Sequence, residues 1–443
     1  MAVSASTPTT VAGLFKKVYS SIKDLLPEGY PMQELAAFDA AEKAGESISY
    51  AIVLSHENGL TLAGTSGDVV TFEDAQSGVV KQALIKGCES FVSSAISTGA
   101  LSRSAAEGEA AFKKASVSRV KSNIKSHNRF IEQMCLYGQD ASGLGRVAYF
   151  TGTWQGASFT AGAGTLAGIV FATGGVNIAA KKILINPQDY ASGIWLGAEG
   201  MPVRERAIGG AVTATGLVVS VDLKNAIVEV DFVPTVASGA SSHCLELINQ
   251  NASSGLDFLG AKGILSTDGS VFGISNAVYG IWKGSRVDNA AGKLTFAKLV
   301  DAVMEACNKG LDKDVVVLTS FESWADLMSE QAALRKYDSN YEVNEAVNGM
   351  EGIKFHSVNG EIVIKPSRFV RRADSFILAQ EDWKRVGSSD LTMKIPGLDD
   401  NELVQKPTTT NAFTFRSYSD QALICLAPCQ SVYISNIDPA AAS

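Results

Sequence analysis

The most constraining feature of this sequence is an acidic, glycine-punctuated stretch over residues 46–80. It contains no lysine or arginine, and its acidic side chains are Glu46, Glu57, Asp68, Glu73 and Asp74. Apolar runs at residues 48–54 and 60–63 flank Asn58-Gly59, a dipeptide that accepts the positive φ angles of a tight hairpin turn. A two-stranded ribbon buries too little apolar surface to be stable alone. The sequence therefore predicts an acidic hairpin ribbon that a basic surface must hold.

A segment near the N-terminus also needs a surface to pack on. Its apolar residues recur at helical spacing until Pro27, Gly29 and Pro31 end the pattern. The stripe consists of Val11, Leu14, Phe15, Val18, Ile22, Leu25 and Leu26. Two interpretations stay open, namely a helix packed on its own body and an arm packed on a neighbouring subunit.

A long basic helix is predicted from Ser104 to Gly138. Residues 104–107 have the S-x-x-E form of a capping box. Apolar residues keep helical spacing at Val117, Val120, Ile124, Ile131 and Met134, and basic residues occupy the other faces at Lys113, Lys114, Arg119, Lys121, Lys125 and Arg129. Such a charge run is usually a solvated face, and the alternative is contact with an acidic partner.

The remainder divides into a β-rich part and a mixed part. From Arg146 to about Ile248, short apolar runs at 182–185, 216–221 and 226–230 predict strands of a small barrel or sandwich. Beyond it, helices are predicted at 296–309 and 323–334, with a buried strand at Val315–Leu318. Further strands are predicted at residues 362–364, 375–378 and 422–426.

Composition limits the function classes. A chain of 443 residues with 46% hydrophobic residues has room for two or three domains with ample core. Its net charge of −8 disfavours a dedicated nucleic-acid binder. The six cysteines show no paired spacing, which indicates reduced thiols, and the N-terminus lacks the pattern of a secretory signal. Residues 147–180 carry no charge, but their glycines indicate β structure rather than a membrane span.

Catalytic motifs are absent or weak. No phosphate-loop, zincin or nucleophile-elbow motif occurs, and Gly162–Ala167 matches the dinucleotide fingerprint without the required strand and helix around it. The histidines, at positions 56, 127, 243 and 356, are predicted to be surface or hydrogen-bonded core residues. His243 and Cys244 are neighbours on a predicted strand and so point to opposite faces. The sequence therefore predicts no catalytic, cofactor-binding or metal site, and a chain that is not an enzyme.

Three stretches resemble the major capsid proteins of tailed bacteriophages. Phe130–Gly138, running on through Gly143-Leu144-Gly145, resembles the end of their long spine helix. Val315–Ser320, with Trp324 and Leu327 after it, is similar to their buried strand and following helix. Asp374–Leu378 with Trp383, preceded by Arg368, Arg371 and Arg372, is similar to a later strand.

The resemblance spans about residues 33–437 and implies the Hong Kong ninety-seven type α+β fold, shared with encapsulins. The implied parts are an N-terminal arm (1–45), an extended loop (46–100), the spine helix of the peripheral domain (101–145), a β-rich segment with a small barrel-like insertion (146–250), a connection (251–295), a mainly axial domain (296–430), and a C-terminal strand and tail (431–443).

The resemblance also implies a function. The chain is expected to self-assemble into hexamers and pentamers of an icosahedral shell, which encloses double-stranded DNA without sequence-specific binding. Separate scaffolding, portal and decoration proteins are implied, with no cofactor and no membrane, and the chain is expected in the virion capsid after assembly in the host cytoplasm. Some relatives link subunits through a lysine of the extended loop, but residues 46–80 contain none.

Two alternatives stay open, an encapsulin-like nanocompartment shell and an α/β enzyme with a β insertion. For the capsid interpretation, the residues predicted to contact another subunit lie on the arm, the acidic ribbon, the basic helix and an arginine pair. They are Leu14, Phe15, Val18, Ile22, Glu57, Asn58, Asp68, Glu73, Asp74, Lys113, Lys114, Arg119, Lys121, Arg371 and Arg372.

Overall fold

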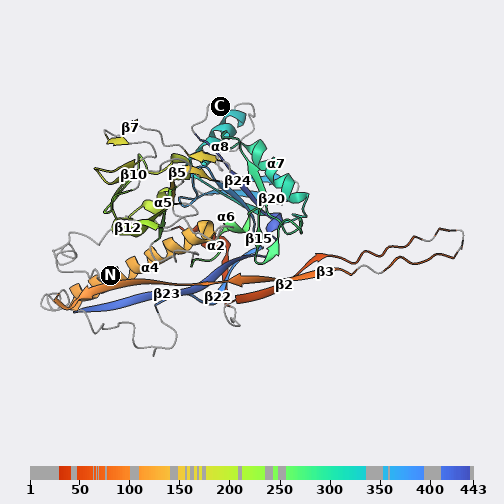
Figure 1. Ribbon diagram of the computed structural model, residues 1–443, viewed down its shortest axis with the longest axis horizontal. Coiled ribbons are helices and arrows are strands. Elements are labelled where there is room, and N and C mark those ends of the chain that lie inside the picture. Colours follow the sequence, from red (N-terminus) through yellow and green to blue (C-terminus); the bar gives the residue numbers. More distant parts are fainter. Residues whose placement is uncertain are drawn as a thin grey trace.

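The computed structural model describes residues 29–40, 47–62, 64–65, 67, 69–74, 77–99, 109–139, 148–154, 157–159, 164–166, 169–171, 176–207, 212–234, 243–247, 256–335, 353–357, 360–393 and 411–439. Within these ranges, three sheets of four to eight strands and one long helix form a body. A thin two-stranded ribbon projects far from one end of that body (Figure 1). The fold is α+β, as the sequence predicts.

The long helix, α4, confirms the predicted basic helix in its described part. It ends at Tyr137, and the next residue lies against the backbone of residues 258–260. Only glycine fits there, because a Cβ on Gly138 would lie 2.3 Å from the carbonyl oxygen of Phe258. The described helices are α2 (Pro31–Leu35), α4 (Glu109–Tyr137), α5 (Ser192–Trp195), α6 (Ala261–Ile264), α7 (Phe296–Cys307) and α8 (Phe321–Arg335), with 3-10 turns η1 (Pro187–Asp189) and η3 (Pro428–Gln430). The predicted capping box and N-terminal stripe lie outside the described residues.

A six-stranded mixed sheet follows the order β17-β24-β21-β18-β20-β19. Its central strand β18 is buried at every position, which agrees with its run of valines and leucine. Helices α7 and α8 pack against this sheet (Figure 1). Its strands are β17 (Ser285–Asp288), β18 (Val315–Thr319), β19 (Ile353–Ser357), β20 (Gly360–Pro366), β21 (Ser375–Ala379) and β24 (Val432–Ser435).

The β-rich segment forms an eight-stranded antiparallel sheet in the order β6-β5-β14-β11-β12-β13-β10-β9. Among the described residues, its pairing runs from β6 to β9 without returning to close a barrel. Its strands are β5 (Ala148–Trp154), β6 (Ala157–Phe159), β9 (Val176–Asn177), β10 (Lys182–Leu184), β11 (Pro202–Ala207), β12 (Val212–Asp222), β13 (Ile227–Val230) and β14 (His243–Leu247). The hairpin of β7 (Gly164–Leu166) and β8 (Ile169–Phe171) lies outside it, which places Gly164 of the fingerprint-like run on a strand.

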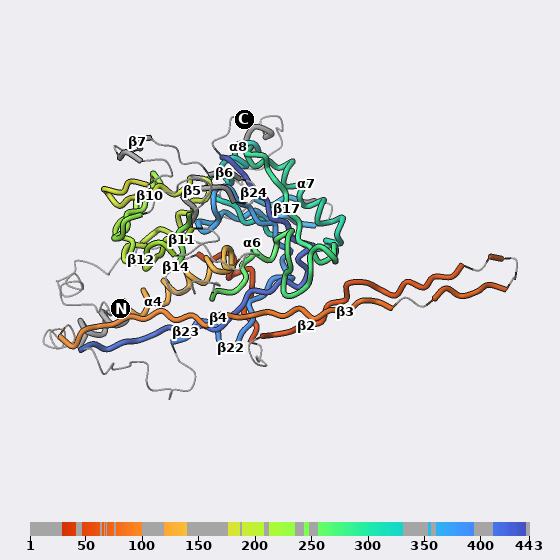
Figure 2. The backbone as a smooth tube through the Cα atoms, viewed as in Figure 1, coloured from red at the N-terminus to blue at the C-terminus, as the bar shows by residue number. Residues whose placement is uncertain are grey.

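A long four-stranded sheet follows the order β1-β22-β23-β4, in which only β1 and β22 run parallel. Its strands are β1 (Ala37–Ala40), β4 (Cys88–Ser97), β22 (Trp383–Thr392) and β23 (Ala412–Cys425). Helix α4 packs on β4 and β23. Residues far apart in sequence therefore form one elongated layer beneath the helix (Figures 1 and 2).

The ribbon pairs different segments from those that the sequence predicts. Strand β2 (Ser47–Ser55) pairs antiparallel with β3 (Val79–Lys86), and residues 60–63 belong to no described strand. The predicted hairpin at Asn58-Gly59 is therefore wrong. The inner face of the ribbon base explains the observed pairing, because Leu54, Ala83 and Ile85 are buried in the main hydrophobic core. A short hairpin, β15 (Ser270–Val271) with β16 (Ile274–Ser275), supports β3 through a bond from the Leu84 N–H to the Phe272 carbonyl.

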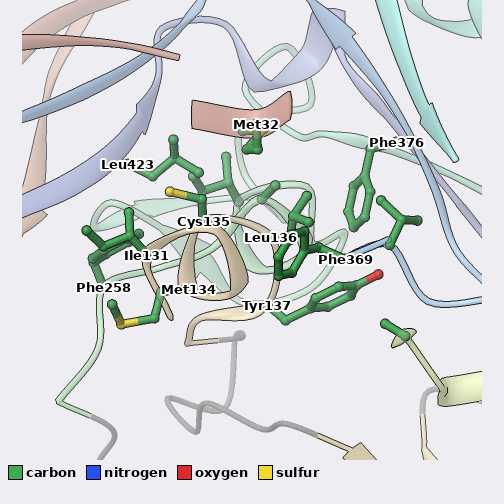
Figure 3. Close-up of a cluster of buried hydrophobic side chains, with 14 of the residues drawn as sticks. Met32, Ile131, Met134, Cys135, Leu136, Tyr137, Phe258, Phe369, Phe376 and Leu423 are labelled. Atoms are coloured by element: carbon green, nitrogen blue, oxygen red, sulfur yellow. The ribbon is translucent and has the colours of Figure 1, made fainter. Parts of the chain in front are cut away.

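The C-terminal end of α4 forms the centre of the main core. Ile131, Cys135 and Leu136 are fully buried, and Figure 3 shows the last turns of the helix between Met32, Leu423, Phe258 and Phe376. A second core cluster lies between α7, α8 and the six-stranded sheet. Burial of Ile131 and Met134 follows from the helical spacing of the predicted apolar positions, so the sequence predicts this part of the packing face.

A buried polar junction closes this end of α4, with two acidic and two basic side chains and two tyrosines. Its members are Tyr137, Asp189, Lys262, Arg371, Asp374 and Tyr433. The Arg371 guanidinium bonds Asp189 at 2.7 Å and lies 4.1 Å from the centroid of the Tyr137 ring. Lys262 pairs with Asp374 at 3.3 Å, and the Tyr433 hydroxyl donates to the same carboxylate at 2.7 Å. The junction therefore joins α4, η1, α6, β24 and the segment before β21.

Two buried titratable side chains attach α4 to its neighbours. The ring nitrogens of His127 lie 2.7 Å from Ser90 Oγ on β4 and 2.8 Å from Ser417 Oγ on β23, and burial lowers the pKa of His127 to about 4. The Glu132 carboxylate accepts the backbone N–H groups of Met32 and Gln33 at 2.9 and 3.0 Å. It thereby caps α2, and burial raises the pKa of Glu132 to about 7.

We predict that acidification loosens the contact between α4 and the long sheet through His127. The folded protein keeps His127 neutral down to about pH 4, whereas the unfolded chain protonates it near pH 6.5. The contribution of neutral His127 to the free energy of unfolding is therefore fully present above pH 6.5. It is lost, by up to about 3 kcal/mol, as the pH falls toward 4. Urea unfolding at pH 7 and pH 5 measures the loss.

The matched control is His127→Gln, whose amide can bond both serines but does not titrate in this range. Glu132 has the opposite pH dependence, because its raised pKa stabilises the fold at low pH and this stabilisation is lost as the pH rises through 7. Both proteins contain Glu132, so its effect on the free energy of unfolding cancels in the comparison. An equal fall in the free energy of unfolding between pH 7 and pH 5 in the two proteins would contradict the assignment to His127.

Candidate functional site

The outer part of the ribbon, residues 56–78, is the most exposed apolar segment described. Leu60, Leu62 and Val69 are almost completely exposed, and the Phe72 side chain is 86% exposed. The Glu73 N–H donates to Thr61 Oγ at 2.8 Å, which joins the two legs of the ribbon. Side chains of this size are normally covered in a folded protein, so their clustering marks an interaction surface.

The predicted acidic residues of the ribbon share this exposed position. Glu57, Glu73 and Asp74 are exposed, and none forms an ion pair with a described residue. Asn58 is also exposed, and its side chain donates to the neighbouring His56 carbonyl. Asp68 lies outside the described residues. The ribbon therefore presents apolar and acidic groups together, and no residue in the described part of the chain pairs with these acidic groups.

The base of the ribbon has one attached face and one open face. On the attached face, the Tyr50 hydroxyl donates to the Cys425 carbonyl at 3.0 Å. On the open face, Val53 pairs with Val80 and Ala51 with Gln82, and all four side chains are exposed and uncharged. The base thus fixes the direction in which the ribbon leaves the body (Figure 2).

The structure separates the predicted arginine pair. Arg371 is only 2% exposed and belongs to the buried polar junction, so we do not retain it as a contact to another subunit. Arg372 is half-buried, bonds Glu322 at 2.7 Å and lies 5.3 Å from the Tyr190 ring centroid. A pair of this exposure is held loosely and contributes little to stability.

Sequence reasoning missed Arg368 as a site residue. Arg368 is exposed, forms no ion pair with a described residue, and lies 5.8 Å from the ring centroid of Phe321, which is 43% exposed. Its carbonyl accepts the Gly193 N–H at 2.9 Å. Nothing in the sequence distinguishes Arg368 from Arg371, because the segment that holds both is a loop without helical or strand periodicity.

The basic helix supplies a second cationic surface. Between residues 110 and 131 it carries six lysines and arginines and no acid. Lys121 is exposed and Arg119 half-buried, and Lys113 and Lys114 belong to the same helix. Arg129 instead bonds the Leu196 carbonyl at 2.7 Å and is structural. The predicted contacts Leu14, Phe15, Val18 and Ile22 lie outside the described residues.

The titratable clusters of the body serve packing. His243 is buried and bonds Glu205 at 2.7 Å, and Glu246 bonds Arg204 and Arg206 on the opposite face of the same strands. His127 and His243 are thus hydrogen-bonded core residues, as predicted. Within the described ranges, no group of three or more histidine, cysteine or acidic side chains is arranged to hold a metal ion.

None of the described helices combines the length and the apolar character that a membrane-crossing helix needs.

Comparison with known proteins identifies the fold. No protein-family model matches the chain, and no curated protein matches it by sequence. Among solved structures it resembles the capsid asymmetric unit of Cyanophage A-1(L), with 10% identity and a TM-score of 0.53 over 98% of this chain and 99% of that chain. This likeness extends over nearly the whole of both chains. It shows that the chain has the fold of a tailed-phage capsid protein, as its sequence predicts.

Two further capsids match over a similar length. The capsid of a native GTA particle is 9% identical, with a TM-score of 0.45 over 98% of this chain and 99% of that one. The capsid of Myoviridae Phage XM1 is 9% identical, with a TM-score of 0.44 over 96% and 97%.

The different burial of the two neighbouring arginines gives a direct prediction. Arg371→Ala leaves the Asp189 carboxylate buried without its guanidinium, and we expect it to lower the free energy of unfolding by about 3–5 kcal/mol. Arg372→Ala removes a half-exposed pair and should cost about 1 kcal/mol or less. Urea unfolding of both variants measures the difference, and equal losses would contradict the burial of Arg371.

Proposed function

We propose that this chain is a structural shell protein, the major capsid protein of a tailed bacteriophage, and not an enzyme. The observation that carries the proposal is the shared fold with the Cyanophage A-1(L) capsid chain over nearly the full length of both. The exposed ribbon supports it independently, because a soluble monomer would leave Leu62, Val69 and Phe72 in water. Assembly covers such groups.

The shape of the ribbon indicates how copies associate. A projecting ribbon and the surface that receives it are different patches, so the contact is head-to-tail. Head-to-tail contacts close into rings when the rotation between copies allows it, and rings of five and six are the units of an icosahedral shell. We propose that the acidic ribbon lies on a cationic surface of the adjacent copy, for which Lys113, Lys114, Arg119, Lys121 and Arg372 are candidates.

The parts of the chain take defined roles in this proposal. Residues 1–45 are the arm, 46–100 the extended loop and 101–145 the spine helix of the peripheral domain. Residues 146–250 hold the β-rich insertion, 251–295 the connection, 296–430 mainly the axial domain, and 431–443 the C-terminal strand and tail.

The shell is assembled in the host cytoplasm with separate scaffolding and portal proteins, and with decoration proteins where the shell carries them. It encloses double-stranded DNA, and the net charge of −8 suits a container that does not hold that DNA tightly.

Electron microscopy and sedimentation velocity of the purified chain test the proposal. We expect closed shells, sheets, or rings of five and six subunits, formed alone or under crowding that favours association. DNA in shells isolated from infected cells supports a phage head, and an enclosed enzyme would instead support an encapsulin-like compartment. A chain that stays a compact monomer or dimer under every condition, with its scaffolding protein present as well as absent, would contradict a shell protein.

We predict that charge reversal on the ribbon slows or misdirects assembly. Glu73→Lys with Asp74→Lys replaces acidic groups that steer the ribbon toward a cationic surface, and the association rate should fall about tenfold or more at low salt. Light scattering follows the rate, and microscopy the particle shape.

The control is Asp301→Lys with Glu381→Lys, which makes the same charge change at exposed positions off the ribbon. The monomer fold should be intact in both double variants, because none of these side chains is buried. A normal shell yield and a normal assembly rate in the ribbon variant would contradict the proposed electrostatic role of the ribbon.

A further inference from the structure

The exposed surface formed by Arg368 and Phe321 is suited to bind a segment that is both acidic and aromatic. Arg368 lies in the loop after β20, and Phe321 is the first residue of α8. The guanidinium lies 5.8 Å from the ring centroid, and both side chains reach solvent. Apart from this mutual contact, the Arg368 charge forms no ion pair with a described residue, and Phe321 keeps 43% of its surface exposed.

The backbone beneath this surface is firmly held. The Ser367 N–H donates to the Thr319 carbonyl at 2.8 Å, and the Phe369 N–H donates to Ser367 Oγ at 3.2 Å. Gly193 packs directly on Arg368, because a Cβ there would lie 3.0 Å from the Arg368 Cβ. A receiving surface fixed before binding loses little entropy when it is occupied.

We propose that this surface receives the ribbon segment around Phe72, Glu73 and Asp74 of a second copy of the chain. This inference rests on the proposed function and names the partner surface of the ribbon. Arg368 would pair with Glu73 or Asp74, and the Phe72 ring would cover Phe321. The two surfaces match in both charge and apolar character, and both are exposed in the single chain.

The cationic helix matches the ribbon less completely. Lys121 offers a charge, but none of the large exposed apolar side chains described belongs to α4. Arg372 is already paired with Glu322, and Arg371 is buried. Of these described cationic surfaces, Arg368 with Phe321 is therefore the one that fits both parts of the ribbon segment.

Cysteine cross-linking tests the contact in the assembled protein. Glu73→Cys is combined with Arg368→Cys, and the control combines Glu73→Cys with Lys298→Cys, an exposed position on α7. We expect mild oxidation of the first assembled variant to give covalent dimers and longer chains on non-reducing gels, with at least a tenfold lower yield from the control. Shells without the 73–368 bond would overturn the inference while the proposed function stands.

Charge exchange gives a second, independent measurement. Arg368→Glu should slow assembly at least tenfold, Glu73→Arg should do the same, and the two together should restore most of the wild-type rate. Lys298→Glu is the matched control and should assemble normally. Normal assembly of Arg368→Glu, or no recovery in the double variant, would overturn the inference. If the wild-type chain forms neither rings nor shells, the proposed function fails, and this inference fails with it.

Discussion

The rest of the structure depends on the buried polar junction at the end of α4. Arg371, Lys262, Asp189 and Asp374 are all removed from water, and each is tolerated there only because an opposite charge lies within hydrogen-bonding distance. The four groups come from parts of the chain separated by up to 185 residues. Because moving any one of these parts would leave a charge unpaired, the junction fixes the placement of the helix, the β-rich module and the six-stranded sheet. A buried charged junction of this kind selects one arrangement of the packed elements more than it adds to the free energy of unfolding.

The body and the ribbon differ in whether their charged and apolar side chains are covered within the single chain. The body pairs the four charges of the buried junction internally, and its sheets and helices share two hydrophobic cores. Within the described residues, the ribbon is attached to the body at its base, through contacts that include Leu54, Ala83 and the Tyr50 hydroxyl. Beyond the base, it has two legs joined by few contacts and side chains that favour an apolar or cationic neighbour. These exposed side chains are the ones that the proposed contact with another copy of the chain would cover.

Local patterns predicted the elements well, but they did not predict pairing over a long loop. The helical spacing around Ile131 and the valine run of β18 specify their elements because the burial face follows from periodicity alone. Asn58-Gly59 predicted a turn because that dipeptide favours one intrinsically. The true partner of β2 lies after residue 78, and the choice is made by burial of Leu54, Ala83 and Ile85 on the body. That contact is tertiary, so no window of sequence around the turn contains it.

The candidate site shows the same limit at the level of single side chains. Three arginines lie within five residues, at positions 368, 371 and 372. Because their side chains are of the same type, the sequence alone cannot assign them different roles. Tertiary structure gives them different roles: Arg371 neutralises a buried carboxylate, Arg372 pairs at the surface, and Arg368 faces solvent over an aromatic ring. The sequence could locate cationic charge near this loop, because charge is a property of composition. Which arginine is available to a partner depends on where Asp189 and Glu322 lie in space, and those positions are set by the junction that holds the whole fold.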